Sequence, residues 1–370
     1  MNSTPESGHS GALTVLALNS GSSSFKFGLY RVSATHAEAL LAGDHESASI
    51  EGQGDALRDV VERLGARGLP RPDVIGHRVV HGGPALHRHG LIDAEVLRQL
   101  EAAAVFAPLH TPAALSVIRL AQQHFPGTPQ VACLDTVFHA DLPPVAQVLP
   151  IARELQAEGI RRYGFHGLSC ESIVRQLAHA LPQRLVIAHL GNGASITAVR
   201  DGRSIDTSMG LTPAGGLMMG TRSGDLDPGL LVYLMREMQL DAAGLDDLVN
   251  RRSGLLGVSG VGSDMRRLHA AAASNPDAAL AVEMFCQSVR KQVAAMAAVL
   301  GGIDCLAFTG GIGENDARVR EAITRGLAWI GGLQVQVLPS QEDAQIARHA
   351  WACAIRPLRR SAPPESRSRS

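Results

Sequence analysis

The string GHRVVHGG places an arginine beside an apolar residue near the end of a predicted strand. Successive side chains of a strand alternate between its faces, so Arg78 and Val80 share one face. A guanidinium group binds a carboxylate through two parallel hydrogen bonds, and an apolar neighbour contacts the alkyl end of the acid. This pair therefore predicts a site for a small carboxylic acid. The alternative is a surface arginine with a solvated partner.

A second arginine lies in a long irregular stretch. Residues 206–228, DTSMGLTPAGGLMMGTRSGDLDP, are rich in small residues and show no periodicity. Loops of this length are usually functional or mobile. Arg222 lies within this stretch, and Asp225 and Asp227 follow closely enough to orient its guanidinium group. The stretch is therefore a second candidate for binding an anion.

Glycine-rich turns can offer backbone N–H groups to a phosphate. TGGIGEN, Thr309–Asn315, ends a predicted strand and opens a helix, where the amides and the helix dipole favour an anion. His166 lies between glycines in YGFHG, although a lone histidine is more often structural. The common nucleotide signatures are absent, because neither Lys26 nor Lys291 ends a Walker A string and Asp316 replaces the third glycine of a dinucleotide turn.

One pattern occurs twice along the chain. Val15–Arg31 and Val186–Gly202 each consist of an apolar strand, a turn rich in Gly, Ser and Asn, and an alternating strand. Taken alone, either turn is explained by an ordinary hairpin. The presence of both predicts a duplicated sheet domain in which each half begins with the same hairpin, and each small, polar tip can offer its backbone N–H groups to an anion.

Composition restricts the class of protein. The 370 residues are 45 % apolar and 19 % charged, which excludes disordered and fibrous chains and predicts about two domains. The formal charge of −1 gives no overall attraction to nucleic acid or to an anionic membrane. Five scattered cysteines without a C-x-x-C pair fit a reducing cytoplasm. The longest apolar stretch, 278–300, contains Glu283, Arg290 and Lys291 and therefore predicts a core helix.

Short β-branched runs alternate with helical patterns, which predicts an α/β fold. Strands are expected at 13–18, 24–31, 74–80, 130–134, 185–189, 194–199 and 304–309. Helices are expected at 55–66, 93–104, 112–124, 169–180, 228–238, 277–300, 315–327 and 340–351. Thr111 is the expected N-cap of one of these helices, and Ser340, which forms a capping box with Asp343, is that of another. The Ser- and Pro-rich ends, 1–11 and 361–370, are expected to be disordered tails.

Taken together, residues 12–350 resemble the acetate kinase family. The resemblance rests on the strings NSGSSSFK, GHRVVHGG, APLH, DTVFH, GIRRYGFHG, HLGNGASI, DTSMGLTP, MMGTRSGDLDP, SGLLGVSGVGSDMR and FTGGIGEN, in this order. It implies a duplicated actin-like ATPase (ribonuclease H-like) α/β fold, with mixed sheets flanked by helices. Residues 12–150 plus 347–360 would form the first domain, and residues 151–346 the second, which carries nucleotide-binding segments. A cytoplasmic homodimer is implied, with no nucleic-acid or membrane partner.

The resemblance also implies roles for individual residues. The catalytic residues would be Asp135, His166 and Arg222. The acid would contact Arg78, with Val80, Leu109, Phe165 and Pro213 lining its alkyl pocket. The nucleotide, ATP or ADP, would contact Lys26, His189, Leu190, Gly191, Asn192, Gly193, Asp264, Met265, Arg266, Gly311, Ile312, Gly313, Glu314 and Asn315. Mg²⁺, with Mn²⁺ as the alternative, would contact Asn19 and Glu342.

The implied reaction is reversible, in-line transfer of the ATP γ-phosphoryl group to acetate, giving acetyl phosphate and ADP. Acetate is ionised at neutral pH, so Asp135 is expected to orient groups or act with the metal rather than to serve as a base. Glu342 has a simpler alternative role beside the dipole of the helix that follows Ser340. A propionate kinase is an alternative function, because one methylene is worth only about 1–3 kcal/mol. A catalytically weak, nucleotide-binding paralogue of the same fold is another.

The sequence departs from the family pattern at several positions. In GFHGLSC, Leu168 and Cys170 replace a hydroxyl and an imidazole. Thr111 replaces Asn, Gly215 replaces Glu, and Met265 stands where an aromatic residue often contacts the nucleotide. These changes are expected to affect efficiency and acid preference more than the type of reaction.

Overall fold

The computed structural model describes residues 11–21, 24–46, 50–108 and 110–360. Leu109 and the predicted tails, apart from Gly11, lie outside this part of the chain. The chain divides into two compact units. The first contains residues up to Val137 and those from Gln341 onwards, and the second contains Phe138–Ser340. Among the described residues, no helix has the length and apolar character needed to cross a bilayer.

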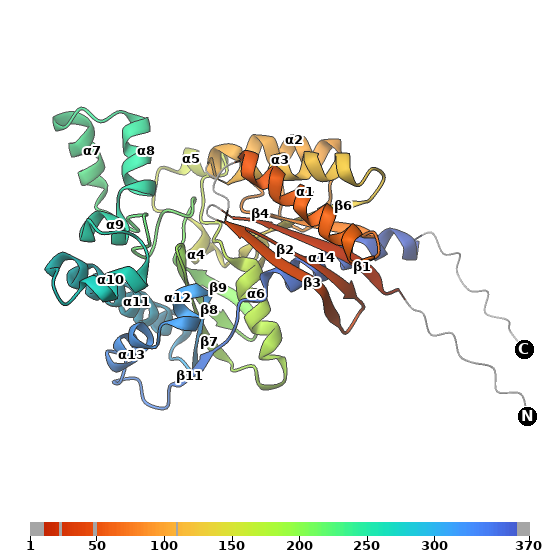
Figure 1. The fold of residues 1–370 in the computed structure, drawn as a ribbon. Helices are drawn as coiled ribbons and strands as arrows, with labels where there is room; N and C mark the ends of the chain where they lie inside the picture. Colours follow the sequence, from red (N-terminus) through yellow and green to blue (C-terminus); the bar gives the residue numbers. More distant parts are fainter. Residues whose placement is uncertain (1–10, 22–23, 47–49, 109, 361–370) are drawn as a thin grey trace, which may run out of the picture. The chain divides into compact units, whose positions relative to one another are not determined.

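The first unit is built on a mixed sheet of six strands in the order β3-β2-β1-β4-β6-β5 (Figure 1). Its strands are β1 (Leu13–Ser20), β2 (Ser24–Val32), β3 (Ala37–Glu46), β4 (Val74–Val79), β5 (Gly90–Leu91) and β6 (Gln130–Leu134). β1, β2 and β3 form an antiparallel meander, whereas β1, β4 and β6 run parallel to one another. The carboxyl ends of these three parallel strands therefore lie at one edge of the sheet.

Helices cover both faces of this sheet. The helices are α1 (Ile50–Ala66), α2 (Ala94–Ala102), α3 (Thr111–His124) and α14 (Glu342–Arg360), with a 3-10 turn at Ala103–Phe106. A further 3-10 turn, Val137–His139, begins at the last residue of this unit and continues into the second. α1 and α3 bury Leu57, Val60 and Val117 against Leu16 and Leu18 of β1. On the opposite face α14 lies so close to β4 that a Cβ on Gly76 would approach Ile346 Cγ2 to 2.7 Å. Glycine at this position allows α14 to pack directly on the strand.

The second unit has a mixed sheet of five strands in the order β11-β10-β7-β8-β9. Its strands are β7 (Arg184–Leu190), β8 (Ala194–Arg200), β9 (Arg203–Thr207), β10 (Cys305–Thr309) and β11 (Gln334–Val337). β7, β8 and β9 again form an antiparallel meander, and β7, β10 and β11 are parallel. The order β3-β2-β1-β4-β6 in the first sheet thus matches β9-β8-β7-β10-β11 in the second, which confirms the duplication predicted from the two hairpins.

Helices of the second unit are α4 (Pro144–Gln147), α5 (Arg153–Ala157), α6 (Gly167–Gln176), α7 (Pro228–Glu237), α8 (Ala242–Arg251), α9 (Gly254–Ser259), α10 (Met265–Ala271), α11 (Pro276–Leu300), α12 (Gly310–Asn315) and α13 (Ala317–Arg325), with a 3-10 turn at Ala178–Ala180. The long helix α11 packs on β7, β8 and β9. α6 buries Cys170 and Ile173 against Leu185, Ile187 and Val199 of the same sheet. The helix predicted at 277–300 is thus a core helix, as expected.

The predicted elements are present, with shifted ends and several additions. The expected helix at 169–180 is α6 followed by a 3-10 turn, and the expected helix at 340–351 extends to Arg360. Two N-cap predictions are wrong: His110 is the N-cap residue of α3, and α14 begins at Glu342 rather than after Ser340. Strands β3, β5, β9 and β11 and helices α4, α5, α8, α9, α10 and α12 were not predicted as elements.

The unit boundaries lie before the expected domain boundaries at 150/151 and 346/347. Phe138 packs against the apolar cluster of the second unit, with Ile173 and Val174. The segment 341–346 belongs to α14, which packs on β1 and β4. Side-chain packing therefore assigns Phe138 to the second unit and the start of α14 to the first.

Candidate active site

Polar side chains gather where the parallel strands of the first sheet end. Asn19 lies near the end of β1, Arg78 near the end of β4, and Asp135 directly after β6. The first turn of α14 adds Glu342 and Asp343. We call these five residues the strand-end cluster. Ligands in open α/β sheets bind at the carboxyl ends of the strands, which makes this cluster the candidate site of the first unit.

The side-chain amide of Asn19 is held on both sides within the strand-end cluster. Its Nδ2 donates to Glu342 Oε2 at 3.1 Å and to Asp343 Oδ1 at 2.9 Å. Its Oδ1 accepts from Arg78 Nη1 at 3.1 Å. The opposite orientation would place the amide oxygen against two carboxylates and the amide nitrogen against a guanidinium group. The charges around Asn19 therefore determine which way the amide points.

Arg78 forms a close ion pair with Asp135. Nε and Nη2 donate to Asp135 Oδ2 at 3.0 and 2.7 Å, and Glu342 Oε2 lies 3.7 Å from Nη1. With the bond to Asn19, three of the five guanidinium N–H groups are engaged in the described part of the chain, which leaves two for a bound carboxylate. Burial raises the pKa of the Asp135 carboxyl group, the ion pair with Arg78 opposes this rise, and the charge of Glu342 adds to it.

The strand-end cluster has the donor chemistry of a divalent-cation site. Asp135 is only 1 % exposed, and its Oδ1 is buried with no hydrogen-bond partner among the described residues. Three carboxylates surround one guanidinium group, and Lys26 is the only further cation among the charges that act on Asp343. A hard divalent cation prefers oxygen ligands and would neutralise this excess negative charge. The carboxylates, Glu342 among them, therefore fit Mg²⁺. Asn19 could contact the ion only through Oδ1, which already accepts from Arg78, so its predicted metal contact stays a prediction.

The other predicted residues of the first unit have less defined surroundings. Lys26 lies opposite Asn19 in the β1–β2 register and is exposed. Val80 follows β4 and is buried, two residues beyond Arg78. Leu109, predicted to line the acid pocket, lies outside the described residues. Its role and that of Val80 stay predictions.

In the second unit, His166 has a constrained backbone and a fixed side chain. Its φ of 58° lies in the left-handed region, which is uncommon for a residue other than glycine and is concentrated at functional sites. Its Nδ1 lies 3.0 Å from Ser195 Oγ, and its ring stacks on that of His189 with centroids 4.1 Å apart. The ring is thus held at its edge by Ser195 and on its face by His189.

His189 is in turn held by a chain of polar contacts. Its Nδ1 lies 2.8 Å from Ser169 Oγ, and Ser340 Oγ donates to Ser169 Oγ at 3.1 Å. The backbone N–H of Ser340 donates to Glu314 Oε1 at 2.9 Å, and that of Gly310 donates to the same oxygen at 3.0 Å. These bonds connect the His166–His189 pair to the turn at the start of α12. The Glu314 carboxylate therefore accepts from two backbone N–H groups of the protein. Its predicted contact with the nucleotide stays a prediction.

Gly193, in the turn between β7 and β8, lies against both predicted catalytic side chains of the second unit. A Cβ built on this glycine would lie 3.2 Å from His166 Nε2 and 3.3 Å from Arg222 Nη1. Arg222 is buried, and its Nη1 also donates to the carbonyl oxygen of Pro213 at 3.3 Å. The structure therefore brings together His166, Arg222, Gly193 and Pro213, which were predicted separately as catalytic, nucleotide-binding and acid-binding residues.

Asp225 and Asp227, which were expected to orient Arg222, form other bonds. Asp225 Oδ1 accepts from the backbone N–H of Gly216, and Asp227 is the N-cap of α7. A Cβ on Gly215 would lie 3.3 Å from the same Asp225 oxygen. The glycine that departs from the family pattern therefore leaves room beside this carboxylate.

The predicted nucleotide-binding segments of the second unit lie near one another at the ends of β7 and β10. His189 pairs with Thr309 in the parallel register, so the turn at Gly191–Gly193 follows β7 as α12 follows β10. Asn192 contacts the irregular loop, where its backbone carbonyl accepts from Gly220 N at 3.0 Å. Leu190, Ile312, Gly313 and Asn315 also belong to these two segments.

The third predicted nucleotide segment lies at the start of α10. Asp264 is the N-cap residue and forms an ion pair with the exposed side chain of Arg266. Met265 lies between them and is buried. Its side chain is therefore in the interior of the unit. The family resemblance implied that Met265 contacts the nucleotide, which stays a prediction.

Cys170 and Leu168 are explained by packing. Both are buried, and Cys170 lies in the apolar cluster beneath α6, where its Sγ donates to Thr197 Oγ1 at 3.7 Å. Phe165 is also fully buried, and its carbonyl oxygen lies 3.0 Å from His139 Nε2. The contacts that fix His166 come from Ser195 and His189, so neither departure removes them.

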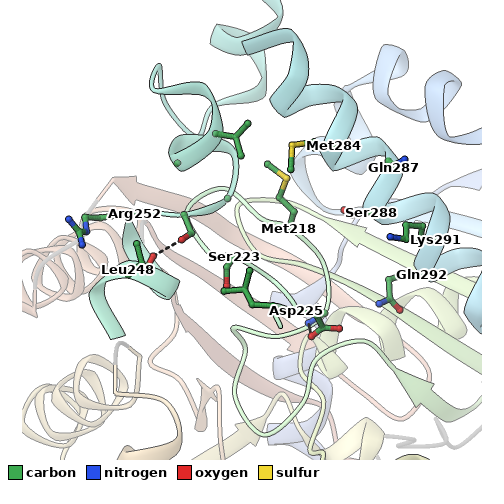
Figure 2. A pocket seen from close by; sticks show the side chains of 16 residues that line it. Met218, Ser223, Asp225, Leu248, Arg252, Met284, Gln287, Ser288, Lys291 and Gln292 are labelled. Carbon is green, nitrogen blue, oxygen red and sulfur yellow. Dashed lines mark hydrogen bonds between the residues drawn. The ribbon is translucent and has the colours of Figure 1, made fainter. Parts of the chain in front are cut away.

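A separate cavity of about 700 Å³ lies between the irregular stretch 206–228 and α11 (Figure 2). Met218, Ser223 and Asp225 of the loop line one side, and Met284 and Lys291 of α11 line the other. No local sequence pattern predicts this cavity, because its lining comes from residues far apart in the chain. It shares the loop with Arg222 but contains none of the predicted site residues.

Three site residues were not predicted: Asp343, Ser169 and Ser195. Asp343 was interpreted only as part of a helix cap, and the two serines lie in strings that were quoted for other residues. Hydrogen-bonding residues of this kind have no spacing signal of their own. Their roles depend on which strand ends and helix starts lie side by side.

Comparisons with known proteins agree with this fold. The acetokinase family matches residues 43–346. An acetate kinase of Methylocella silvestris is 40 % identical over 394 aligned residues, which cover 91 % of this chain and 97 % of its own. An acetate kinase of Thermosynechococcus vestitus is 42 % identical over 366 aligned residues, covering 86 % of this chain and 88 % of its own.

Solved structures give the same result. The crystal structure of Porphyromonas gingivalis acetate kinase matches with a TM-score of 0.79 at 32 % identity, covering 92 % of this chain and 99 % of its own. That of a propionate kinase from Francisella tularensis matches with a TM-score of 0.80 at 36 % identity and the same coverage. The predicted α/β fold class, with two mixed sheets flanked by helices, is confirmed.

Proposed function

The chain belongs to the acetokinase family and is a phosphotransferase with a carboxyl group as acceptor, and we propose that its reaction is reversible transfer of the ATP γ-phosphoryl group to acetate. The products are acetyl phosphate and ADP. In this reaction an acetate oxygen forms a bond to the γ-phosphorus as the bond from that phosphorus to the β–γ bridging oxygen breaks. The displaced oxygen remains on ADP, and no proton has to be removed from acetate.

Arg78 binds the carboxylate of the acid in this proposal. Its two remaining N–H groups can hold acetate, while Asp135 fixes the guanidinium group by accepting from Nε and Nη2. Asp135 is thus an orienting residue and not a base, because acetate is already ionised. The buried side chain of Val80 supplies apolar contact for the methyl group.

His166 and Arg222 stabilise the charge of the transferring phosphoryl group. Phosphoryl transfer proceeds through a loose, in-line transition state in most analyses, so catalysis consists chiefly of positioning and of neutralising charge on the equatorial oxygens. The approach of His166 Nε2 and Arg222 Nη1 to Gly193 is the observation that carries this assignment. Arg222 Nη1 is a donor, and His166 Nε2 is one when Nδ1 accepts from Ser195 Oγ or when the ring is protonated. Backbone N–H groups at Asn192–Gly193 and in the first turn of α12, from Gly311, bind the phosphates, whereas that of Gly191 already donates to the Gly193 carbonyl oxygen.

Mg²⁺ is the cofactor in this proposal, with Asn19 and Glu342 as its contacts and Asp135 Oδ1 as a further oxygen. When bound, the ion neutralises charge on the ATP phosphates. Mg²⁺ usually retains several waters and needs only one or two protein oxygens together with phosphate oxygens, which fits this small set of ligands.

An acyl hydroxamate assay tests the proposed reaction. Purified protein is incubated with ATP, Mg²⁺ and acetate, propionate or butyrate, and the acyl phosphate is trapped with hydroxylamine. We expect acyl phosphate to form with acetate at the highest kcat/KM, in proportion to ADP. Higher kcat/KM with propionate would identify a propionate kinase. ATP binding without acid-dependent ADP formation would identify an inactive paralogue and contradict the proposal.

We also propose that the protein is a homodimer that acts in the cytoplasm. The α7 helix, PGLLVYLMRE, has no buried residue although all of it is described, and Val232, Tyr233 and Met235 are about half exposed. An apolar helix surface of this kind is typical of a protein interface. All five cysteines are free, in keeping with a reducing compartment. Light scattering of the native protein and of Tyr233→Glu tests the dimer: we expect twice the monomer mass for the native protein and the monomer mass for the variant.

A further inference from the structure

The strand-end cluster contains a carboxylate for which the proposed reaction has no role yet. Asp343 follows Glu342 in the first turn of α14 and is partly buried. Its Oδ1 accepts from Asn19 Nδ2 at 2.9 Å, between residues that are 324 positions apart in the chain. Carboxylates in the first turn of a helix often serve only the helix dipole, and they need no such partner.

Asp343 contacts Asn19, the residue that connects the proposed metal-binding carboxylates with the proposed acid-binding Arg78. Asn19 donates to both carboxylates of α14 and accepts from Arg78. Each Nδ2 hydrogen therefore has its own acceptor. If Asp343 lost its charge, its oxygen would be a weaker acceptor, and the amide would be less strongly held with Oδ1 toward Arg78.

A second observation indicates that the cluster binds a cation. Asp135 is 1 % exposed, its Oδ2 accepts from Arg78, and its Oδ1 has no hydrogen-bond partner among the described residues. Removing water from a carboxylate oxygen without giving it a partner is costly. The orphaned oxygen lies in the same cluster as Glu342 and Asp343, so a bound cation would satisfy it and offset the negative charge.

We propose that Asp343 is a positioning residue for the metal and the acid: it holds the Asn19 amide with its oxygen toward Arg78 and completes the set of carboxylates that binds Mg²⁺. This inference rests on the proposed function, which assigns the metal to Asn19 and Glu342. Loss of Asp343 therefore weakens metal binding and, through Arg78, the binding of acetate. Contacts of the nucleotide with the second unit are unaffected.

The test measures metal binding directly, with Mn²⁺ as the probe. Electron paramagnetic resonance reports free Mn²⁺ during titration of the protein in the presence of ADP. The variants are Asp343→Asn, Glu342→Gln, the conservative Asp343→Glu and the control Asp277→Asn. Asp277 is also a carboxylate in the first turn of a helix, α11, but it is exposed and far along the chain from the cluster. It therefore controls for a pure helix-dipole effect.

Replacement of residues that support metal ligands typically costs 10–100-fold in affinity or activity, so we expect Asp343→Asn to weaken Mn²⁺ binding about tenfold. Asp343→Glu should stay within about threefold of the native protein, because it retains the charge, and Asp277→Asn should not differ from it. At saturating Mg²⁺, which offsets the weaker metal binding, the KM for acetate should rise about tenfold in Asp343→Asn, with a much smaller change in the KM for ATP. A purely structural role would lower the melting temperature without this split between the two substrates.

The outcomes separate this inference from the function on which it rests. Native Mn²⁺ affinity in Asp343→Asn with weakened affinity in Glu342→Gln overturns the role of Asp343 and leaves the metal site intact. Native affinity in both variants overturns the metal site itself. If Asp343→Asn does not fold, Asp343→Ala is measured in its place, because it removes the charge without placing a second amide against Asn19.

Discussion

The rings of His166 and His189 stack with their centroids 4.1 Å apart and their planes inclined by 21°. Ser195 holds the first ring through Nδ1, and Ser169 holds the second in the same way. The orientation of the proposed catalytic imidazole thus depends on a neighbouring ring as well as on its own hydrogen bond. This arrangement predicts that Ser169 affects catalysis although it bonds to His189 and not to His166.

Ser169→Ala should lower kcat about tenfold while changing the KM for ATP little, because the loss of the bond to His189 Nδ1 loosens the stack on His166. Steady-state kinetics measures both constants. Ser172→Ala is the matched control, since Ser172 lies one turn further along α6 and donates to the carbonyl oxygen of Ser169. A kcat equal to that of the native protein would show that His189 needs no support from Ser169.

Arg222→Ala should lower kcat roughly 10³-fold and leave the affinity for ATP nearly unchanged, because the guanidinium group acts on charge that develops during transfer. Nucleotide binding is measured by calorimetry and kcat by coupled ADP release. Arg222 is buried, so the melting temperature of the variant is compared with that of Arg222→Lys to separate folding from catalysis. A native kcat in a folded variant removes Arg222 from the mechanism.

Val80→Ala should shift preference from acetate toward propionate and butyrate, because it enlarges the proposed alkyl pocket. The ratio of kcat/KM for propionate to that for acetate should rise about tenfold, within the range of one or two methylenes. Val79→Ala is the control: Val79 is also buried, but it packs in the apolar cluster with Leu100 and Ile118. Equal ratios in the two variants would place Val80 outside the pocket.

Acid should destabilise the protein through two buried histidines. Burial lowers the pKa of His77 to about 4, against the opposing bond to Gln130, and likewise lowers that of His139 to about 4, against the bond to the Phe165 carbonyl. The unfolded chain binds a proton at each site below its ordinary pKa of about 6.5, whereas the folded protein does not until pH 4. Stability is therefore retained above pH 6.5 and falls as the pH decreases from 6.5 to 4.

Chemical denaturation of the native protein and of His77→Gln across pH 4–7 tests this expectation. The variant keeps a polar side chain beside Gln130 but cannot titrate, so its free energy of unfolding should depend less steeply on pH. Parallel curves for the two proteins would show that His77 is not one of the groups responsible.

Local sequence patterns were sufficient for the hairpins and for most helices, because strand alternation, turn composition and apolar periodicity are short-range signals. The duplicated hairpins Val15–Arg31 and Val186–Gly202 are the clearest case. Strand β11 was missed because its residues, Gln334–Val337, are all exposed and lie at the edge of the sheet. The prediction of Ser340 as an N-cap was wrong. Its backbone N–H and its hydroxyl group donate to Glu314 and Ser169 instead, and the helix begins at Glu342.

The candidate site could be predicted only in part. Local sequence was enough to single out two residues: Arg78 because it lies near the end of a predicted strand, and Arg222 because it lies in a long irregular loop. It was not enough for Asp343 and Ser169, because their importance arises from contacts with Asn19 and His189, which lie far away in sequence. Long-range hydrogen bonds of this kind depend on the packing of α14 and α6 on their sheets. A single sequence carries no direct record of such packing.

The connection into α14 has no spare length. The backbone of Ser340 is bonded to Glu314, and Glu342, only two positions later, accepts from Asn19. Gln341 is thus the single residue between two anchored points. This junction is therefore a poor place to insert a tag, a fluorescent domain or new chain termini.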